Sequence, residues 1–264
     1  MPHISSIVNN RITDIFERKE KNILSIYVTA GYPKLNDTTA IITALEKSGG
    51  DMIELGMPFS DPLADGPIIQ ESGQKALENG MSLKVLFEQL EGIREQVDVP
   101  LLLMGYVNPI FQFGFEAFCK KCQEVGVDGI IIPDLPMEEW LSDYKDIFEK
   151  YCLKNIFLIT PQTSEERIRF IDKNSDGFIY VVSSASTTGN KKEIQESKQY
   201  FNRIQDMNLA SPCLIGFNIH DKASFDFASA NSNGGIIGSA FIKALARSDD
   251  PILGTKNFIK SILS

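Results

Sequence analysis

The stretch IELGMPFSDPLADGPIIQ, residues 53–70, joins an apolar run to a stiff loop and then to a run that can form a helix. Three prolines fix φ and remove backbone donors within the loop, so this part of the stretch cannot be helical. The apolar run carries Glu54, and the loop carries Asp61 and Asp65. A buried strand, an acidic loop and a helix therefore follow one another here.

Runs resembling the first part of this stretch, rich in β-branched residues, recur eight times along the chain. They are continuously apolar rather than alternating, as expected of parallel strands covered on both faces. Segments with helical periodicity separate them, including 82–97 and 164–174. The eight predicted strands lie at 23–30, 51–55, 100–106, 129–134, 155–160, 177–182, 212–217 and 234–240.

Strand–helix alternation of this kind over 264 residues predicts an α/β fold, a (β/α)8 TIM barrel. The competing architecture, a doubly wound open sheet, usually carries G-x-G-x-x-G after its first strand, whereas residues 29–35 read TAGYPKL. Residues 4–22 have the pattern of an extra N-terminal amphipathic helix that could cover the bottom of the barrel. The sequence contains no linker-like tract, so we expect residues 1–264 to form a single barrel domain.

Four turns that lead from a helix into a strand resemble one another. They lie in segments 47–55, 124–132, 174–182 and 231–239, and each places small residues or glycine just before the strand. Glycine beyond a helix end commonly adopts the left-handed conformation that caps the helix. We therefore expect glycine C-caps at these turns, as shared turn chemistry rather than a repeat of the solenoid kind.

The charge and hydropathy of the chain exclude several classes of partner. A formal net charge of −9 argues against a nucleic-acid partner, which would need a basic surface, and disfavours docking on an anionic membrane. No apolar run reaches the length of a bilayer-spanning helix. The first residues, MPHISSIVNN, lack the regions of a signal peptide, so we expect a cytoplasmic protein.

The four cysteines are too sparse for a disulfide scaffold of this size. Cys119 and Cys122 form a C-x-x-C pattern, which can indicate redox or metal chemistry. The pair lies inside an amphipathic run, and no second pair completes a zinc site. With only His3 and His220 available as histidine ligands, we predict two helix-packing thiols and no metal site.

The loops that follow the strands carry the candidate chemistry, because such loops build the active sites of barrels. Glu54 lies near the end of the second strand, and Asp65 lies on the loop after it. Two carboxylates over one cavity suit general acid–base catalysis, because burial and mutual repulsion can separate their pKa values. Taken singly, acids in such positions are more often hydrogen-bonded buried groups or turn formers.

Glycine and serine follow the seventh and eighth strands, in IGFNIHD (215–221) and IGSAFIK (237–243). Barrels often hold a phosphate at this place with backbone N–H groups and a helix N-terminus. The loop after the sixth strand, SSASTTGNKK (183–192), has the composition of a lid or anion cradle, and equally that of a solvated surface loop. Its lysines, Lys191 and Lys192, could approach a phosphate. The three loops together favour a phosphate site.

The segment ELGMPFSDPLADGP, residues 54–67, closely resembles the signature of the tryptophan synthase alpha chain family. This resemblance implies a (β/α)8 barrel lyase that cleaves indole-3-glycerol phosphate into indole and glyceraldehyde 3-phosphate, with no metal or organic cofactor in this chain. The similarity extends over almost the whole chain, in TAGYP (29–33), MGYVNPIF (104–111), VGVDGIIIPDLP (125–136), TTG (187–189), IGF (215–217) and GSAFIK (238–243).

The resemblance also implies roles for individual residues. Glu54 matches the family's proton-transfer glutamate, and Asp65 matches the second catalytic acid, which bonds the indole N–H. The tyrosines among the family's substrate-binding positions line its indole pocket or support the aspartate, and the glycines and serine near the barrel's end bind phosphate. The substrate-binding positions correspond to Tyr27, Tyr106, Tyr180, Thr188, Gly189, Gly216, Asn218, Gly238 and Ser239.

The family further implies a partner, the tryptophan synthase beta chain, in an alpha2beta2 heterotetramer. Pyridoxal phosphate is expected on that beta chain, which receives indole through a tunnel. An exposed Pro-Phe beside an active site is best explained as an interface, since it is otherwise an apolar liability. The residues expected to face the partner are Pro58, Phe59, Asp61, Asn108 and Pro109.

Two departures from the family pattern leave alternatives open. Ser186 and Thr187 stand where the sixth loop usually has Gly-Val, and Asn218 stands where the seventh usually has glycine. Loss of a glycine should restrict the opening range of the sixth loop and alter its closure, whereas asparagine tolerates left-handed backbone. A regulatory subunit that cleaves poorly but activates the beta chain is therefore a second hypothesis, and another phosphosugar barrel enzyme is a third.

Overall fold

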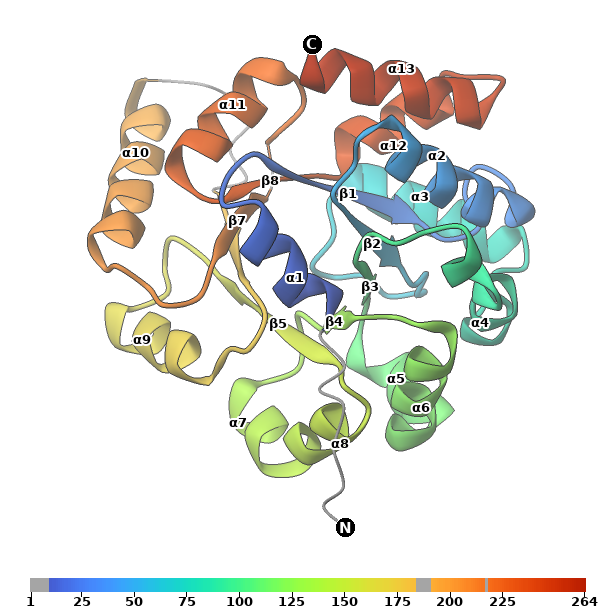
Figure 1. The fold of residues 1–264 in the computed structure, drawn as a ribbon, viewed down its shortest axis with the longest axis horizontal. Helices are drawn as coiled ribbons and strands as arrows, with labels where there is room; N and C mark the ends of the chain where they lie inside the picture. The colour runs from blue at the N-terminus through green and yellow to red at the C-terminus, as the bar shows by residue number, and fades with distance from the viewer. Residues whose placement is uncertain (1–9, 184–190, 217) are drawn as a thin grey trace.

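The computed structural model describes residues 10–183, 191–216 and 218–264, with side chains omitted at 191–198. Its eight parallel strands close into a barrel in chain order, with the last strand paired to the first, which confirms the predicted TIM barrel (Figure 1). All eight predicted strands are present. They are β1 (Ile23–Thr29), β2 (Met52–Gly56), β3 (Leu101–Met104), β4 (Gly129–Ile131), β5 (Lys154–Ile159), β6 (Ile179–Val182), β7 (Cys213–Gly216) and β8 (Gly234–Ile237).

Helices follow every strand and form the outer ring seen in Figure 1. The helix expected over 82–97 is instead two pieces, because Gly92 has a φ of 73° and separates α4 from a 3-10 turn. The helices are α1 (Arg11–Arg18), η1 (Leu35–Asp37), α2 (Thr38–Ser48), α3 (Pro67–Glu78), α4 (Leu83–Leu90), η2 (Ile93–Glu95), α5 (Val107–Phe113), α6 (Phe115–Val125), α7 (Met137–Glu139), η3 (Trp140–Tyr144), α8 (Lys145–Lys150), α9 (Glu165–Asn174), α10 (Lys191–Asp206), α11 (Lys222–Asn231), α12 (Ser239–Ala246) and α13 (Pro251–Leu263).

The N-terminal helix α1 closes one end of the barrel, as expected, and lies across its centre in Figure 1. Ile12 and Ile15 are buried with inward side chains of the strands. Asn10 caps the helix by accepting from the Ile12 N–H at 2.9 Å, and its amide donates to carbonyls just before β4 and β5. The expected length of 4–22 was too long at its C-terminal end, because the helix stops at Arg18; residues 4–9 lie outside the described part.

The helix-to-strand turns use glycine in two ways. Gly49 and Gly126 have φ values of 106° and 81° and cap α2 and α6, as predicted. The other two turns contradict the prediction, because α9 and α11 end at serines in extended conformation. Glycine serves there as space for packing: a Cβ on Gly177 would lie 2.6 Å from Ile156, and one on Gly234 would lie 2.0 Å from the Ile23 carbonyl oxygen.

Other predictions from composition concern the cysteines and the membrane. Cys119 and Cys122 are free, buried thiols in α6, which confirms them as helix-packing residues. Among the described residues, no helix combines the length and apolar character needed to span a membrane. The same part of the chain holds no cluster of three His, Cys, Asp or Glu side chains arranged for a metal ion.

Candidate active site

Glu54 is a fully buried carboxyl on β2, and its side chain points into the barrel from the same face as Met52. Its Oε1 accepts a hydrogen bond of 2.8 Å from the Ser25 hydroxyl on β1. Its Oε2 has no hydrogen-bond partner among the described residues. Burial raises the pKa of Glu54 to about 7, although the Ser25 hydrogen bond opposes the rise. The carboxyl can therefore both give and take a proton near neutral pH.

Asp65 lies on the loop between β2 and α3, where Tyr106 holds it. The Tyr106 hydroxyl donates to Asp65 Oδ2 at 3.1 Å and accepts from the Ala64 N–H at 2.9 Å. The Gln70 amide donates to the Asp65 carbonyl at 2.8 Å, which ties the loop to the first turn of α3. Burial raises the pKa of Asp65, and the Tyr106 hydrogen bond opposes this rise. Of the two expected tasks of Tyr106, supporting the aspartate is therefore the one observed.

Tyr180 is buried and Tyr27 is half-buried, and both interact electrostatically with the two acids. Burial raises the pKa of each phenol, and the charges of both Glu54 and Asp65 raise it further, so the four groups share one site. Glycines at the strand ends make room for the rings. A Cβ at Gly56 would lie 2.0 Å from the Tyr27 hydroxyl.

Gly216 serves Tyr180 in the same way, since a Cβ there would lie 2.3 Å from the hydroxyl of that tyrosine. Gly216 is the last residue of β7 and pairs with Ile236 of β8. A strand end that must approach a tyrosine in this way has to be glycine. The sequence comparison with phosphate-binding loops did not reveal this packing role.

The expected phosphate positions cluster at the ends of β7 and β8. Gly238 precedes α12, whose first turn has no side-chain cap, and Ser239 opens that helix. Asn218 has a φ of 57°, so the expectation that asparagine adopts left-handed backbone here is confirmed. Uncapped N–H groups at the start of a helix can bind an anion.

The expected sixth-loop residues lie outside the described part of the chain. Thr188 and Gly189, and the departures Ser186 and Thr187, lie in the undescribed segment 184–190. The side chains of Lys191 and Lys192 at the start of α10 are also outside the described part. Ser183 at the beginning of this loop is buried and donates its N–H to the Gly216 carbonyl at 3.1 Å. The sixth loop therefore starts beside the end of β7, where the predicted phosphate-binding positions begin.

Residues expected to face a partner lie around Asp65. Phe59 is half-buried rather than exposed, because its ring packs on Tyr106 with 5.5 Å between the ring centroids. Pro58 is also half-buried, whereas Asp61 is exposed. The large apolar residue that this loop exposes is Leu63, at 92% exposure, which was not among the residues predicted to face the partner.

The neighbouring loop adds the other two predicted contact residues, which both lie on α5 directly after Tyr106. Asn108 is exposed and Pro109 is half-buried. Because Tyr106 bonds Asp65, this loop and the loop after β2 are joined at the acid. Their exposed residues therefore lie beside the candidate site.

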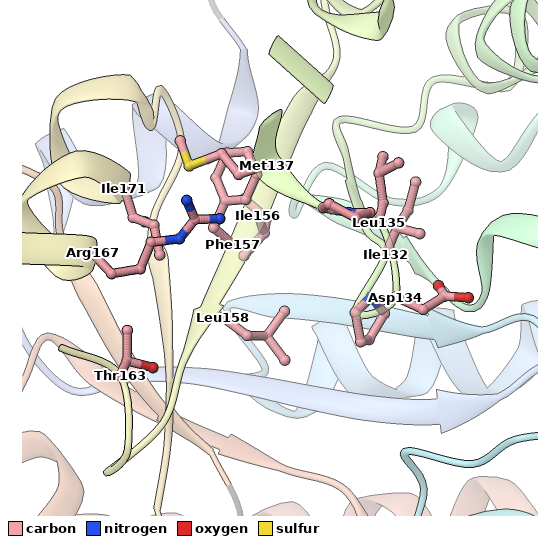
Figure 2. A pocket seen from close by; sticks show the side chains of 12 residues that line it. Ile132, Asp134, Leu135, Met137, Ile156, Phe157, Leu158, Thr163, Arg167 and Ile171 are labelled. Atoms are coloured by element: carbon pink, nitrogen blue, oxygen red, sulfur yellow. The ribbon is translucent and has the colours of Figure 1, made fainter. Parts of the chain in front are cut away.

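A separate cavity of about 300 Å³ lies between the loop after β4 and helix α9 (Figure 2). None of the predicted site residues lines it. Arg167 reaches into it from α9 but is paired with Glu138, and Asp134 accepts the Val107 N–H at 3.0 Å. Because Arg167 is already paired with Glu138, this cavity is a poorer candidate for a phosphate than the ends of β7 and β8.

Ser25, which bonds Glu54, was not among the site residues predicted from the sequence. A polar residue within the apolar run ILSIYVT was a detectable signal, but nothing local indicates its partner 29 positions away. Gly56 was part of the matched signature, yet its role of admitting the Tyr27 ring became apparent only from the packing. Both roles depend on neighbouring strands.

Comparison with known proteins identifies the family of the chain. A family model described as tryptophan synthase alpha chain matches residues 14–261. The tryptophan synthase alpha chain of Parabacteroides distasonis is 54% identical over 254 residues, covering 96% of this chain and 99% of its own. That of Flavobacterium johnsoniae is 59% identical over 242 residues, covering 90% and 94%.

Solved structures agree with these relatives. Tryptophan synthase subunit alpha from Legionella pneumophila superposes with a TM-score of 0.88 at 32% identity, with 97% of both chains covered. A chain of tryptophan synthase from M. tuberculosis, in an aminoacrylate-bound form, gives 0.84 at 27% identity, covering 96% and 98%. The chain therefore belongs to the tryptophan synthase alpha chain family.

Proposed function

We propose that this chain cleaves indole-3-glycerol phosphate into indole and glyceraldehyde 3-phosphate, with Glu54 and Asp65 as catalytic residues. The observation that carries the proposal is the Glu54 carboxyl, which is fully buried and has its pKa raised to about 7. One of its oxygens has no hydrogen-bond partner among the described residues. Such a group exchanges protons at neutral pH without a metal. The substrate is inferred from membership of the family.

The reaction is a retro-aldol cleavage in which the indole ring must become a leaving group. Protonated Glu54 donates its proton to the ring carbon that bears the glycerol chain, and Asp65 accepts a hydrogen bond from the indole N–H as positive charge develops. Glu54, now ionised, accepts the proton of the adjacent glycerol hydroxyl. The carbon–carbon bond then breaks, and its electron pair returns to the ring to restore indole.

The remaining predicted residues bind the substrate. The half-buried Tyr27 and the buried Tyr180 supply aromatic walls near both acids. Backbone N–H groups near Gly216, Asn218, Gly238 and the uncapped start of α12 at Ser239 suit the phosphate. Thr188 and Gly189 are proposed to complete the site from the sixth loop. No cofactor is assigned to this chain.

We propose a beta chain carrying pyridoxal phosphate as the partner, in an alpha2beta2 assembly in the cytoplasm. Residues 1–264 act in this assembly as one barrel domain. The exposed or half-buried apolar surface beside Asp65 supports the contact, because an exposed leucine at a rigid loop is costly unless it is covered. The proposed contact residues are Pro58, Phe59, Asp61, Leu63, Asn108 and Pro109.

Indole release from indole-3-glycerol phosphate tests this function. We expect slow release by the purified chain and a strong rise when a beta chain is added. Absence of release in both conditions would overturn the lyase assignment. If the chain then still stimulated the beta chain, it would be the regulatory subunit suggested by Ser186, Thr187 and Asn218.

A further inference from the structure

Ser25 occupies a place in the barrel that its neighbours fill with apolar side chains. On β1 the side chains alternate: Leu24 and Ile26 join the outer core, whereas Ile23 joins the cluster inside the barrel. Ser25 therefore points inward with Ile23 and Tyr27. It is fully buried. A serine at such a position loses the packing of an aliphatic side chain, so its hydroxyl requires an explanation.

Among the described residues, the Ser25 hydroxyl has one partner, the carboxyl of Glu54. In the β1–β2 register Ser25 lies opposite Met52 and Tyr27 lies opposite Glu54, so the serine reaches diagonally along the sheet. The resulting hydrogen bond is 2.8 Å long, between two side chains that are both fully buried. A serine has one rotatable side-chain bond before its oxygen, so it holds the longer glutamate with little freedom of its own.

We propose that Ser25 is a positioning residue that binds Glu54 Oε1 and thereby assigns the reacting proton to Oε2. This inference rests on the proposed function, because it concerns the proton that Glu54 transfers. If the proton were on Oε1 and that oxygen donated to Ser25 Oγ, the Ser25 hydroxyl hydrogen would be left without another acceptor among the described residues. With the proton on Oε2, the hydroxyl keeps its acceptor. Oε2 is also the oxygen without a described partner, so it is available to the substrate.

Among the described residues, Ser25 is the only hydrogen-bond donor to the Glu54 carboxyl; the other polar groups nearby act on the site through charge. The charge of Glu54 acts on the phenols of Tyr27 and Tyr180, whose pKa values are raised by burial, so both stay neutral. Asp65 acts on the same two phenols. Ser25 opposes the effect of burial on the pKa of Glu54. Removing its hydroxyl should therefore raise that pKa further and loosen the carboxyl.

The first test compares Ser25→Ala and Ser25→Thr with a control, Ser229→Ala, in the full chain with the beta chain added. Ser229 is also a buried serine, but it lies on α11 and its hydroxyl has no described partner. We expect Ser25→Ala to lower kcat for indole release about 10- to 100-fold with KM changed less than about twofold. Because protonated Glu54 starts the cycle, the loss of kcat at alkaline pH should shift to higher pH. Ser25→Thr should restore most of kcat, and Ser229→Ala should match the unmodified chain.

The second test does not depend on activity. The carboxyl absorption of Glu54, assigned as the infrared band lost in Glu54→Gln, is titrated in the unmodified chain and in Ser25→Ala. A titration shifted to higher pH supports the proposal, and an unchanged titration overturns it. Unchanged kcat and pH profile in Ser25→Ala, or a loss of thermal stability without a shift of the titration, also overturn it. If the unmodified chain released no indole, the proposed function would fail, while the infrared comparison would still decide the role of Ser25.

Discussion

At the scale of single residues, the site depends on two carboxyls held in different ways. Glu54 sits on a strand with one hydroxyl donor from β1, and Asp65 sits on a loop with one phenol donor from the neighbouring loop. Burial raises the pKa of both. Each hydrogen bond opposes that rise, so burial dominates. The mutual repulsion expected from the sequence is not the main cause.

We expect Glu54→Gln or Asp65→Asn to reduce indole release by about 100- to 10,000-fold, the usual range for loss of a general acid or base. Asp61→Asn is the matched control on the same loop, because Asp61 is exposed and its carboxylate is bonded only to the Ser60 hydroxyl among the described residues. Steady-state indole release by the isolated chain, with circular dichroism to verify folding, measures both. Near-normal turnover in either acid variant would contradict the assigned roles.

The raised pKa of Glu54 also predicts a dependence of stability on pH. Below its ordinary value of 4.5 the carboxyl is neutral in both folded and unfolded chains, so it carries no penalty there. Between 4.5 and about 7 the folded chain holds more protons, so stability falls as pH rises. The free energy of unfolding of Glu54→Gln, taken relative to that of the unmodified chain, should therefore rise by about 3 kcal/mol from acid to alkaline pH. Urea unfolding at several pH values measures this gain, and a difference independent of pH would show that Glu54 is not desolvated.

Asn218 tests the departure at the seventh loop. Since its φ is 57°, Asn218→Gly should fit without strain and leave KM for indole-3-glycerol phosphate the same or lower. Asn218→Ala keeps a Cβ at this left-handed position and should be destabilised by about 1 kcal/mol. KM and thermal unfolding of both variants provide the comparison. A marked rise of KM in the glycine variant would identify the asparagine side chain as a phosphate ligand.

At the scale of elements, α1 and the strand starts are joined by Asp128, directly before β4. This buried carboxylate pairs with Arg11 of α1 and Arg94 of η2 and accepts the Leu101 N–H at 2.9 Å. Arg94 also donates to the Gly126 carbonyl at the end of α6. One acid thus connects the helix that covers the barrel to the turn that enters β4.

Asp128→Ala should lower the free energy of unfolding by about 3 kcal/mol, because it leaves the half-buried Arg94 without its counter-charge. Glu88→Ala is the control, since the Glu88–Lys84 pair is exposed and should contribute less than about 0.5 kcal/mol. Urea unfolding at neutral pH measures both variants. Equal effects would show that the Asp128 cluster does not secure α1.

At the scale of the whole molecule, the barrel brings the two candidate catalytic acids and the proposed partner surface to the same end. The loop after β2 carries Asp65 on its inner side and Leu63, 92% exposed, on its outer side. Binding of a partner at Leu63 would therefore act on the loop that holds a catalytic acid. This arrangement gives a physical basis for the proposed activation by a beta chain.

Leu63→Asp should weaken beta-chain binding at least about tenfold, because a buried charge would replace an apolar anchor. Leu253→Asp is the control, since Leu253 is 53% exposed on α13 and is not among the proposed contact residues. Calorimetric titration with a beta chain measures the two affinities. Comparable weakening in both variants, or none in the first, would remove Leu63 from the proposed interface.

Local sequence was enough to establish the eight strands, the barrel and the placement of Glu54 and Asp65 at the same end. Continuous apolar runs and proline-rich loops specify these features through residues close together in the chain. Prediction from local sequence was less reliable at the ends of elements, as in α1 and α4, because caps and left-handed glycines such as Gly92 decide where a helix stops.

The tertiary structure alone decided the chemistry of the acids. Ser25 meets Glu54 across 29 positions, and Tyr106 meets Asp65 across 41, through strand register and loop packing. The Glu54 pKa of about 7 arises from desolvation inside a closed barrel, to which all eight strands contribute. Burial and long-range hydrogen bonds are properties of the assembled core, so no local stretch of residues encodes them.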